Sequence, residues 1–161
     1  RKLRDYGQSA KYVHAEIGWN SRLDELQASI LNTAYLPRLS AWTRRRREIA
    51  ARYFRGWKRE DIRLASGVAE SACWHLFPVF TEQKNSLMAH LRSLGIGVGE
   101  HYPNVIPDQP AMQNVNYVVH GDVPQARRIA EQQLSLPIHP YMEDAEVDRV
   151  LAAVESWRAP S

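Results

Sequence analysis

Residues 18–28, which read G-W-N-S-R-L-D-E-L-Q-A, constrain the fold of this chain more than any other segment. Ser21 can cap a helix, and Asp24 three residues later can reach back to the Ser21 amide in a capping-box arrangement. Helical spacing then relates the residues of one face: Leu23, Leu26, Gln27, Ile30, Leu31 and Ala34. The pattern predicts a helix over residues 21–36 that buries this face. Free amides at residues 20–23 could hold a phosphate at the positive end of the helix dipole, or could simply start a helix.

A second helix is predicted over residues 39–57, because Pro37 should break or kink the first one. Its expected inward residues are Leu39, Trp42, Ile49, Tyr53 and Trp57. These two helices have no strand partners close in sequence. Their long apolar faces therefore require another surface, either a further domain or a second subunit.

Strands and helices alternate from residue 74 onward. Strands are expected over residues 74–80, 96–101 and 134–139, and Pro78 should place the first of them at a sheet edge. Helices are expected from Asn85 or Ser86 to Gly95, after a cap at Asp122, and over residues 143–157. The predicted fold class is α/β: a long kinked helix pair followed by a small sheet with helices packed on one side.

Composition is that of an ordinary protein domain. The chain has 161 residues, of which 44% are hydrophobic and 24% charged, and no apolar run approaches the roughly 18 residues of a membrane span. The single cysteine, Cys73, excludes an internal disulfide, reads as a small core residue and favours the cytoplasm. Position 1 is Arg within a polar stretch, which suggests a piece of a longer protein.

A net charge of +3 and four consecutive arginines at residues 44–47 invite a nucleic-acid interpretation. Four adjacent helical positions point all around a helix, so we expect a solvated collar and not a phosphate-binding patch. No base-reading or stacking motif accompanies them, so neither nucleic acid nor membrane is an expected partner.

Two clusters can carry chemistry. Lys11, Tyr12 and His14 precede Asn20, and cations and hydroxyls before a helix start suit a phosphorylated ligand, although they could equally form a surface loop. The second cluster, residues 100–103 (E-H-Y-P), follows a predicted strand, where α/β folds usually bind ligands, or else is a strand end in solvent. The six histidines are scattered, so no metal site is expected.

The order of these motifs resembles the DegT/StrS-type aminotransferases, which use pyridoxal phosphate (PLP) and act on nucleotide-linked keto-sugars. The matching blocks are Arg4-Asp5-Tyr6-Gly7, Lys11-Tyr12-x-His14, the N-S-R-L-D-E-L-Q-A block from Asn20, Trp42 with the arginine run and Ile49-Ala50-x-x-Tyr53, Trp74-His75, His101-Tyr102-Pro103, Gln109-Pro110-Ala111, and Leu134-Ser135-Leu136-Pro137-Ile138-His139-Pro140. The resemblance covers nearly the whole chain.

The resemblance implies the aspartate-aminotransferase fold (fold type I) and a homodimer with active sites at the subunit interface. Residues 1–40 would be the tail of the large PLP-binding domain, and residues 41–161 the small C-terminal domain. Asn20 would reach across the interface to the cofactor phosphate. Lys11, Tyr12 and His14, together with His101 and Tyr102, would help to hold the nucleotide-sugar.

The chain departs from the family pattern at several points. No histidine stands two residues before Gln109-Pro110-Ala111, and the helix over residues 30–42 is one residue longer than expected. The Schiff-base lysine of the family, and the aspartate and aromatic residue that hold the coenzyme ring, would lie upstream, so no catalytic residue is assigned here. Lysine is needed to hold PLP covalently and to move its proton, so we expect no transamination by these residues alone.

Two other interpretations stay open at this point. The chain could be a non-catalytic dimerising or partner-binding module from a split or degraded aminotransferase gene. It could also belong to a dehydratase relative, because the residue that separates the two chemistries would lie upstream.

Overall fold

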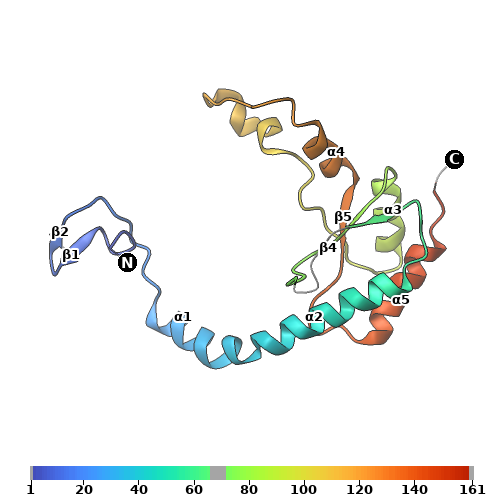
Figure 1. The fold of residues 1–161 in the computed structure, drawn as a ribbon, viewed down its shortest axis with the longest axis horizontal. Coiled ribbons are helices and arrows are strands. Elements are labelled where there is room, and N and C mark those ends of the chain that lie inside the picture. Colours follow the sequence, from blue (N-terminus) through green and yellow to red (C-terminus); the bar gives the residue numbers. More distant parts are fainter. Residues whose placement is uncertain (1, 66–71, 160–161) are drawn as a thin grey trace. The chain divides into compact units, whose positions relative to one another are not determined.

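The computed structural model describes residues 2–65 and 72–159 (Figure 1). The chain divides into two compact units, Arg1–Ala41 and Trp42–Ser161, and the boundary falls within helix α2 (Leu36–Gly56). Each unit is considered separately below. None of the helices in the described residues is long and apolar enough to cross a membrane.

The first unit begins with a hairpin of β1 (Gln8–Ala10) and β2 (Val13–His14). An antiparallel bridge between Asp5 and Asn20 closes the segment behind the hairpin. Two glycines permit this close backbone approach: a Cβ on Gly7, whose φ is +72°, would lie 1.7 Å from the Glu16 carbonyl oxygen, and one on Gly18 would lie 2.1 Å from the Gly7 nitrogen. The G-W-N segment is therefore fixed as extended backbone before the helix starts.

The first helix starts three residues later than the sequence pattern predicts. Helix α1 (Glu25–Ile30) is capped by Asp24, whose Oδ1 accepts hydrogen bonds from the amides of Leu26 at 2.8 Å and Gln27 at 3.4 Å. The expectation that Ser21 caps this helix is wrong, because the Ser21 amide donates to the Arg4 carbonyl at 2.9 Å. That pairing continues the extended segment beyond Asn20 and delays the helix.

Pro37 does not separate two helices. A π-helical turn, η1 (Leu31–Tyr35), joins α1 directly to α2, and the Leu36 amide donates to the Leu31 carbonyl five residues back. A π turn holds more residues than an α turn and shifts the hydrogen-bond ladder just before the proline, which has no amide hydrogen to donate. The turn also gives a place to the extra residue noted between positions 30 and 42.

The sheet of the second unit is antiparallel, in the order β3 (Arg63–Leu64), β4 (Phe77–Phe80), β5 (Gln133–Leu136). Strand β4 is central, so the edge position expected from Pro78 is wrong. The proline is tolerated because the pairing of β3 with β4 covers Val79 and Phe80 only, within the described residues. The strand expected over residues 96–101 is reduced to a single bridge between Gly99 and Ser135.

Three helices complete the second unit, with the short 3₁₀ turns η2 (Ile106–Asp108) and η3 (Pro110–Asn114) between them: α3 (Lys84–Ser93), α4 (Pro124–Gln132) and α5 (Asp144–Ser156). Gly95 ends α3 with a φ of +74°, as the sequence indicates. The cap expected at Asp122 is wrong, because Val123 precedes α4 with left-handed backbone and no side-chain cap bond. Glu143 and Glu146 form a capping box at the start of α5.

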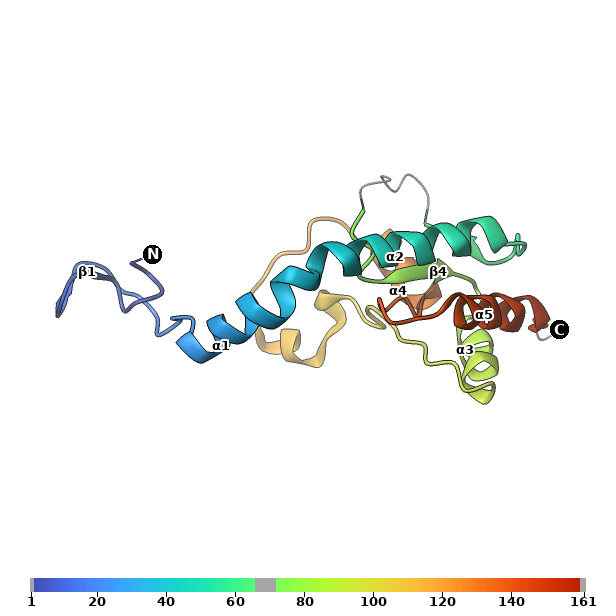
Figure 2. The same cartoon turned by 90° about the horizontal axis from the view of Figure 1, so that it is seen from below.

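The core of this unit lies on one face of the sheet. Phe77, Val79, Leu134 and Leu136 alternate along β4 and β5 and pack with buried residues of α2, α3 and α5. The views in Figures 1 and 2 both place α2 and α5 side by side on this core. The α/β fold with helices packed on one side of a small sheet is thus confirmed.

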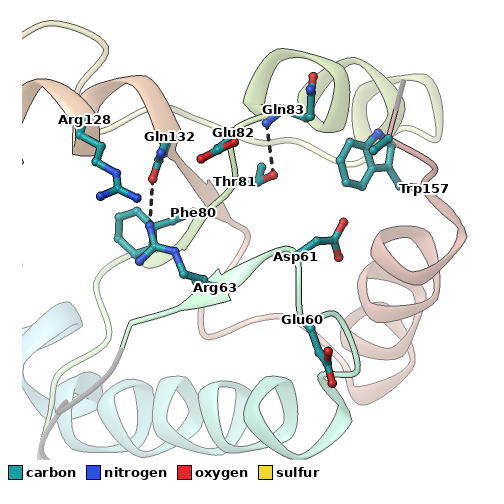
Figure 3. A pocket seen from close by; sticks show the side chains of 11 residues that line it. Glu60, Asp61, Arg63, Phe80, Thr81, Glu82, Gln83, Arg128, Gln132 and Trp157 are labelled. Atoms are coloured by element: carbon teal, nitrogen blue, oxygen red, sulfur yellow. Dashed lines mark hydrogen bonds between the residues drawn. The ribbon is translucent and has the colours of Figure 1, made fainter. Parts of the chain in front are cut away.

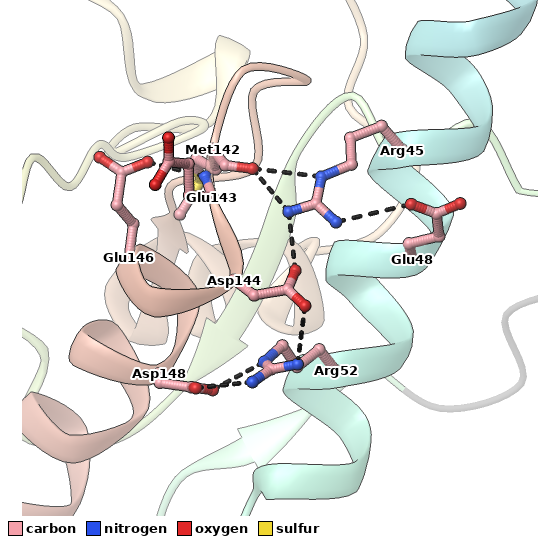
Figure 4. Close-up of polar contacts among 8 residues, drawn as sticks. All are labelled: Arg45, Glu48, Arg52, Met142, Glu143, Asp144, Glu146 and Asp148. Carbon is pink, nitrogen blue, oxygen red and sulfur yellow. Dashed lines mark hydrogen bonds and ion pairs between the residues drawn. The ribbon is translucent and has the colours of Figure 1, made fainter.

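The arginine run is not a solvated collar. Arg45 donates to the Met142 carbonyl at 2.6 Å and to Asp144 at 2.8 Å, and Arg47 donates to the Ala72 carbonyl at 3.1 Å. Arg52, one further turn along α2, forms a two-bond ion pair with Asp148 (Figure 4). The guanidinium groups hold neighbouring segments onto α2, which sequence periodicity alone does not reveal.

Cys73 also differs from expectation. It is exposed, not a core residue. Next to it, Trp74 is partly buried and packs with Phe54 and the buried Phe77, and these three rings contact one another.

Candidate functional site

In the first unit, three of the expected substrate residues lie on or beside the hairpin. Lys11 and Tyr12 form its tip, where the Lys11 ammonium lies 5.2 Å from the centroid of the exposed Tyr12 ring. His14 lies on β2, and its Nδ1 is 2.9 Å from the Tyr6 carbonyl oxygen. The hairpin therefore fixes the imidazole and leaves a cation and a phenol exposed.

Asn20 lies at the other end of the same unit. Its backbone is held by the bridge to Asp5, and its exposed side chain makes no hydrogen bond within residues 2–65 and 72–159. The helix amides beyond it are not an anion site, since Asp24 already occupies those of Leu26 and Gln27. Residues 20–23 lie before the helix, and the Ser21 amide donates to the Arg4 carbonyl, so the helix start expected at these amides lies at Glu25 instead; the Asn20 side-chain amide is an exposed donor.

In the second unit, residues of three separate segments surround a hollow of about 260 Å³. Its lining includes His75 just before β4, His101 after the Gly99 bridge, and His139 after β5. These three positions lie far apart in the sequence, and the antiparallel order of β4 and β5 brings them together. Of the expected site residues, His101 lines the hollow, and Tyr102 adjoins it with its ring 5.6 Å from the His101 ring.

Two residues of α2 support the floor of this hollow. Arg46 Nη1 donates to the carbonyl oxygens of Ile138 at 2.8 Å, Trp74 at 3.2 Å and His75 at 3.3 Å. The buried Tyr53 hydroxyl donates to the Pro137 carbonyl at 2.8 Å, and burial raises the pKa of this hydroxyl. Both contacts connect the two flanks of the hollow to one rigid helix.

The His101 side of the hollow is held by buried polar groups. Lys84 is buried, and its ammonium lies 2.7 Å from a Glu100 carboxylate oxygen and 2.9 Å from the Ala130 carbonyl oxygen. The next residue, His101, donates its backbone amide to Gln133 and places its Nδ1 3.0 Å from the Ser135 hydroxyl. The His101 ring is thereby oriented from two directions.

A second hollow, of about 350 Å³, lies near the end of β4 and contains none of the expected site residues (Figure 3). Arg63 crosses it to reach Gln132 Oε1 at 2.9 Å, with its guanidinium 5.6 Å from the Phe80 ring centroid. Glu60 and Arg128 lie on its rim. It combines charges of both signs without a buried polar group aimed at a ligand.

Sequence reasoning missed His75, His139 and Arg46 as parts of the site. Both histidines stand within motif blocks that match the aminotransferase pattern, so those blocks were the available signal. Although three histidines line one hollow, the part of the chain that the structure describes holds no group of three or more His, Cys, Asp or Glu residues that could bind a metal ion.

Comparison with known proteins places this geometry in context. The DegT/DnrJ/EryC1/StrS aminotransferase family matches residues 1–155. The dTDP-3-amino-3,4,6-trideoxy-alpha-D-glucose transaminase of Streptomyces venezuelae is 40% identical over 159 residues, which are 98% of this chain and 41% of that protein. The dTDP-3-amino-3,6-dideoxy-alpha-D-galactopyranose transaminase of Aneurinibacillus thermoaerophilus is 37% identical over 96% of this chain and 42% of its own length.

Solved structures agree with the fold. The crystal structure of DesV from S. venezuelae superposes with a TM-score of 0.89 at 40% identity, over 98% of this chain and 42% of that one. NtdA from Bacillus subtilis, solved with bound cofactor PMP, is 24% identical and has a TM-score of 0.81 over 96% of this chain and 37% of its own, which shows the fold alone. The chain thus spans about two-fifths of the length of these relatives. With a family match from residue 1 to residue 155, the chain belongs to the DegT/DnrJ/EryC1/StrS aminotransferase family.

Proposed function

We propose that these residues are the C-terminal part of a PLP-dependent aminotransferase that acts on a nucleotide-linked keto-sugar in deoxyamino-sugar biosynthesis, in the cytoplasm. Residues 1–40 would be the tail of its PLP-binding domain and residues 41–161 its small domain. The observation that carries the proposal is the gathering of His75, His101 and His139, each from a separate motif block, around one hollow. The relatives named above are dTDP-sugar transaminases, which supports this substrate class.

Aminotransferases of this family depend on PLP, and one residue of this chain suits the coenzyme phosphate. Asn20 has a fixed backbone, an exposed amide group and no hydrogen-bond partner among the described residues. A neutral amide donor can bind a phosphate oxygen without the cost of burying a second charge. When bound, PLP supplies the electron sink for chemistry at the carbon that carries the amino group.

Each of the two clusters, taken by itself, offers groups that suit part of a nucleotide-sugar. On the hairpin tip, the Lys11 ammonium can meet the charge of the diphosphate, and the Tyr12 ring with the fixed His14 offers a flat surface and a hydrogen bond. His101 and Tyr102 offer hydrogen bonds to sugar hydroxyls.

Partners are expected because one helix face of the first unit is uncovered. Its exposed residues are Leu23, Leu26, Ile30, Leu31, Tyr35, Leu36 and Leu39. Contiguous apolar surface of this kind marks an interaction site. We assign it to the rest of the aminotransferase, in a homodimer. The same face also fits the second candidate function, a dimerising module without catalysis.

The experiment that separates these functions is a chimera. The matched two-fifths of the S. venezuelae transaminase is replaced by this chain, and conversion of dTDP- and UDP-linked keto-sugars is measured. We expect transamination, with Asn20→Ala weakening PLP retention roughly tenfold to a hundredfold, as for loss of one hydrogen bond to a charged group. Asn85→Ala, on the exposed side of α3, should leave retention unchanged.

A chimera that dimerises and holds PLP but converts neither sugar would contradict the proposed activity and favour the module. In a second arm, the chain alone is mixed with PLP, reduced with borohydride and weighed. We expect no stoichiometric adduct, because the Schiff-base lysine is proposed to lie outside these residues. A single pyridoxyl group on one lysine overturns that part of the proposal.

A further inference from the structure

Two buried polar side chains of β5, Gln133 and Ser135, contact His101. Only 4% of Gln133 and 5% of Ser135 is exposed. They occupy alternate positions on the strand and so share its face opposite the helix-covered core. Burial of an amide and a hydroxyl is unfavourable unless their hydrogen bonds are satisfied, and here the bonds all lead to one histidine.

The direction of each hydrogen bond among Gln133, Ser135 and His101 follows from one backbone donor, the His101 N–H. The His101 backbone N–H can only donate, so the group 2.7 Å away must be the Gln133 carbonyl oxygen, Oε1. The other end of the same amide, Nε2, can only donate, and it lies 2.8 Å from the Ser135 hydroxyl oxygen. Ser135 thus accepts one hydrogen bond and retains its own hydroxyl hydrogen.

The Ser135 hydroxyl has one other partner among the described residues, His101 Nδ1 at 3.0 Å. If the hydroxyl donates to Nδ1, then Gln133 Oε1 and Nε2, the Ser135 hydroxyl and His101 Nδ1 all have partners, and the neutral ring carries its hydrogen on Nε2. If instead Nδ1 carried the hydrogen, Ser135 would accept twice and its buried hydroxyl hydrogen would have no acceptor. The first arrangement is therefore favoured.

We propose that Gln133 and Ser135 are positioning residues that hold neutral His101 as the Nε2–H tautomer, so that the ring presents a donor to an oxygen atom of the nucleotide-sugar. The part concerning the ligand rests on the function proposed above; the tautomer does not. His101 lines the hollow, and its Nε2 makes no hydrogen bond within the described residues. Proteins usually fix the tautomer of a histidine through a hydrogen bond to one ring nitrogen, which determines whether the other ring nitrogen donates or accepts.

The backbone around the ring is fixed as well. Gly99 and Ser135 exchange two backbone hydrogen bonds, of 3.3 and 2.8 Å. A Cβ on Gly99 would lie 3.0 Å from His101 Cε1, so the missing side chain leaves room for the ring in this orientation. The ion pair between buried Lys84 and half-buried Glu100 holds the preceding residue. The ring therefore has little freedom to rotate away from Ser135.

The test is the ¹⁵N NMR spectrum of the histidine rings in this chain, at a pH well above the ordinary histidine pKa of about 6.5. We expect the Nε2–H form of His101 to exceed the Nδ1–H form by roughly ten to one. Gln133→Glu should reverse the preference. The introduced carboxylate can accept from the backbone of His101 and from the Ser135 hydroxyl, which leaves the hydroxyl oxygen to accept from Nδ1–H.

The matched control is Gln132→Glu. Gln132 is also buried and adjoins β5, but it bonds Arg63 and not His101, so its replacement should leave the tautomer unchanged. If Gln133→Glu does not fold, Ser135→Ala decides, because loss of the hydroxyl should give a mixture of both tautomers. A parent spectrum with Nδ1–H, or a Ser135→Ala spectrum identical to that of the parent, overturns the proposal.

A final titration with dTDP separates the tautomer from the proposed function. Chemical-shift changes at His101 Nε2 on addition of dTDP are expected if this side of the hollow meets the nucleotide-sugar. The Nε2–H tautomer could depend on Ser135 while dTDP perturbs the His101 ring in neither the chain nor the chimera. This result would uphold the positioning role and contradict the proposal that His101 meets the nucleotide-sugar.

Discussion

The two units of this chain contain similar apolar residues but use them differently. In the second unit, leucines of α3 and β5 such as Leu87, Leu91 and Leu134 are fully buried around the sheet. In the first unit, Gly7 alone is buried among the described residues, while Leu26 is 71% exposed on a helix with regular apolar spacing. The second unit thus has its own core, whereas the first has the sequence of a packed element without the surface that would cover it.

This difference teaches that helical periodicity predicts which face will be covered, but not by what. Four apolar residues of the predicted face, Leu23, Leu26, Ile30 and Leu31, are all exposed in the structure, and Leu23 lies before α1. Short helices gain most of their stability from tertiary packing. The hydrogen bonds of the hairpin and the Asp24 cap must therefore stabilise the first unit when it is uncovered.

The largest expected effect comes from removing the same side chain in each unit. Leu134→Ala should lower the free energy of unfolding of the second unit by about 3 kcal/mol, because it leaves a cavity in a core where the leucine is fully buried. Leu26→Ala should change the free energy of unfolding of the first unit by less than about 0.5 kcal/mol, because solvent already surrounds that side chain. Urea denaturation followed by near-ultraviolet circular dichroism measures both.

In the chimera, we expect the order of the two effects to reverse, so that Leu26→Ala has a larger effect than Leu134→Ala. There, Leu26→Ala is expected to weaken dimerisation in sedimentation experiments, because the proposed function assigns this face to the rest of the aminotransferase dimer. Equal loss of stability for both variants in the chain alone would show that the first unit has a core of its own, and would break the comparison.

A smaller effect is expected from the arginine run. Arg46→Ala should cost about 2 kcal/mol of unfolding free energy, since it leaves three carbonyl oxygens without their shared charged donor. Arg44→Ala, two residues earlier and exposed, should cost less than about 0.5 kcal/mol. The urea midpoints of the two variants provide the measurement. Equal urea midpoints for Arg46→Ala and Arg44→Ala would mean that water can replace the Arg46 guanidinium as the donor to these carbonyl oxygens.

Much of the fold follows from local sequence. The C-terminal end of α3 and the start of α5 agree with the prediction, because Gly95 and Glu143 act within a few residues, whereas α3 starts at Lys84 and not after a cap at Asn85 or Ser86. The failures arise where a distant segment decides. Ser21 does not cap α1 because its amide bonds Arg4, and Pro78 tolerates a central strand because β3 pairs with only part of β4. Neither contact can be predicted from the neighbouring residues alone, because each joins segments that are distant in the sequence.

The candidate site shows the same division. The Lys11–Tyr12 tip and His14 are predicted together because one hairpin holds them, and their ligand roles remain proposals. The hollow around His101 is lined by residues from α2 and from three later segments that are far apart in the sequence, so its membership could not be derived from spacing. Gln133 gave no sequence signal, and Ser135 only its place in a matched motif block, because polar residues in a strand ordinarily face solvent.

The smallest expected effect concerns the ion pairs that join α2 to α5. Arg52 donates two hydrogen bonds to Asp148, of 2.6 and 2.7 Å, and these bonds with the positive charge hold the pKa of the Asp148 carboxyl below its usual range. A carboxyl whose pKa is lower in the folded state stabilises the fold above the unfolded value of about 3.9, and this contribution is lost as the pH falls through the folded pKa. Parent and Asp148→Asn should therefore differ slightly in urea midpoint at neutral pH and converge below about pH 4. The control is Glu60→Gln, because the Glu60 carboxylate has no ion pair in the described residues. This variant should follow the parent at every pH. A constant difference between parent and Asp148→Asn at every pH would mean that shape, and not charge, links the two helices. The covered unit would then owe its stability to apolar packing alone, which is the contribution that the uncovered unit lacks.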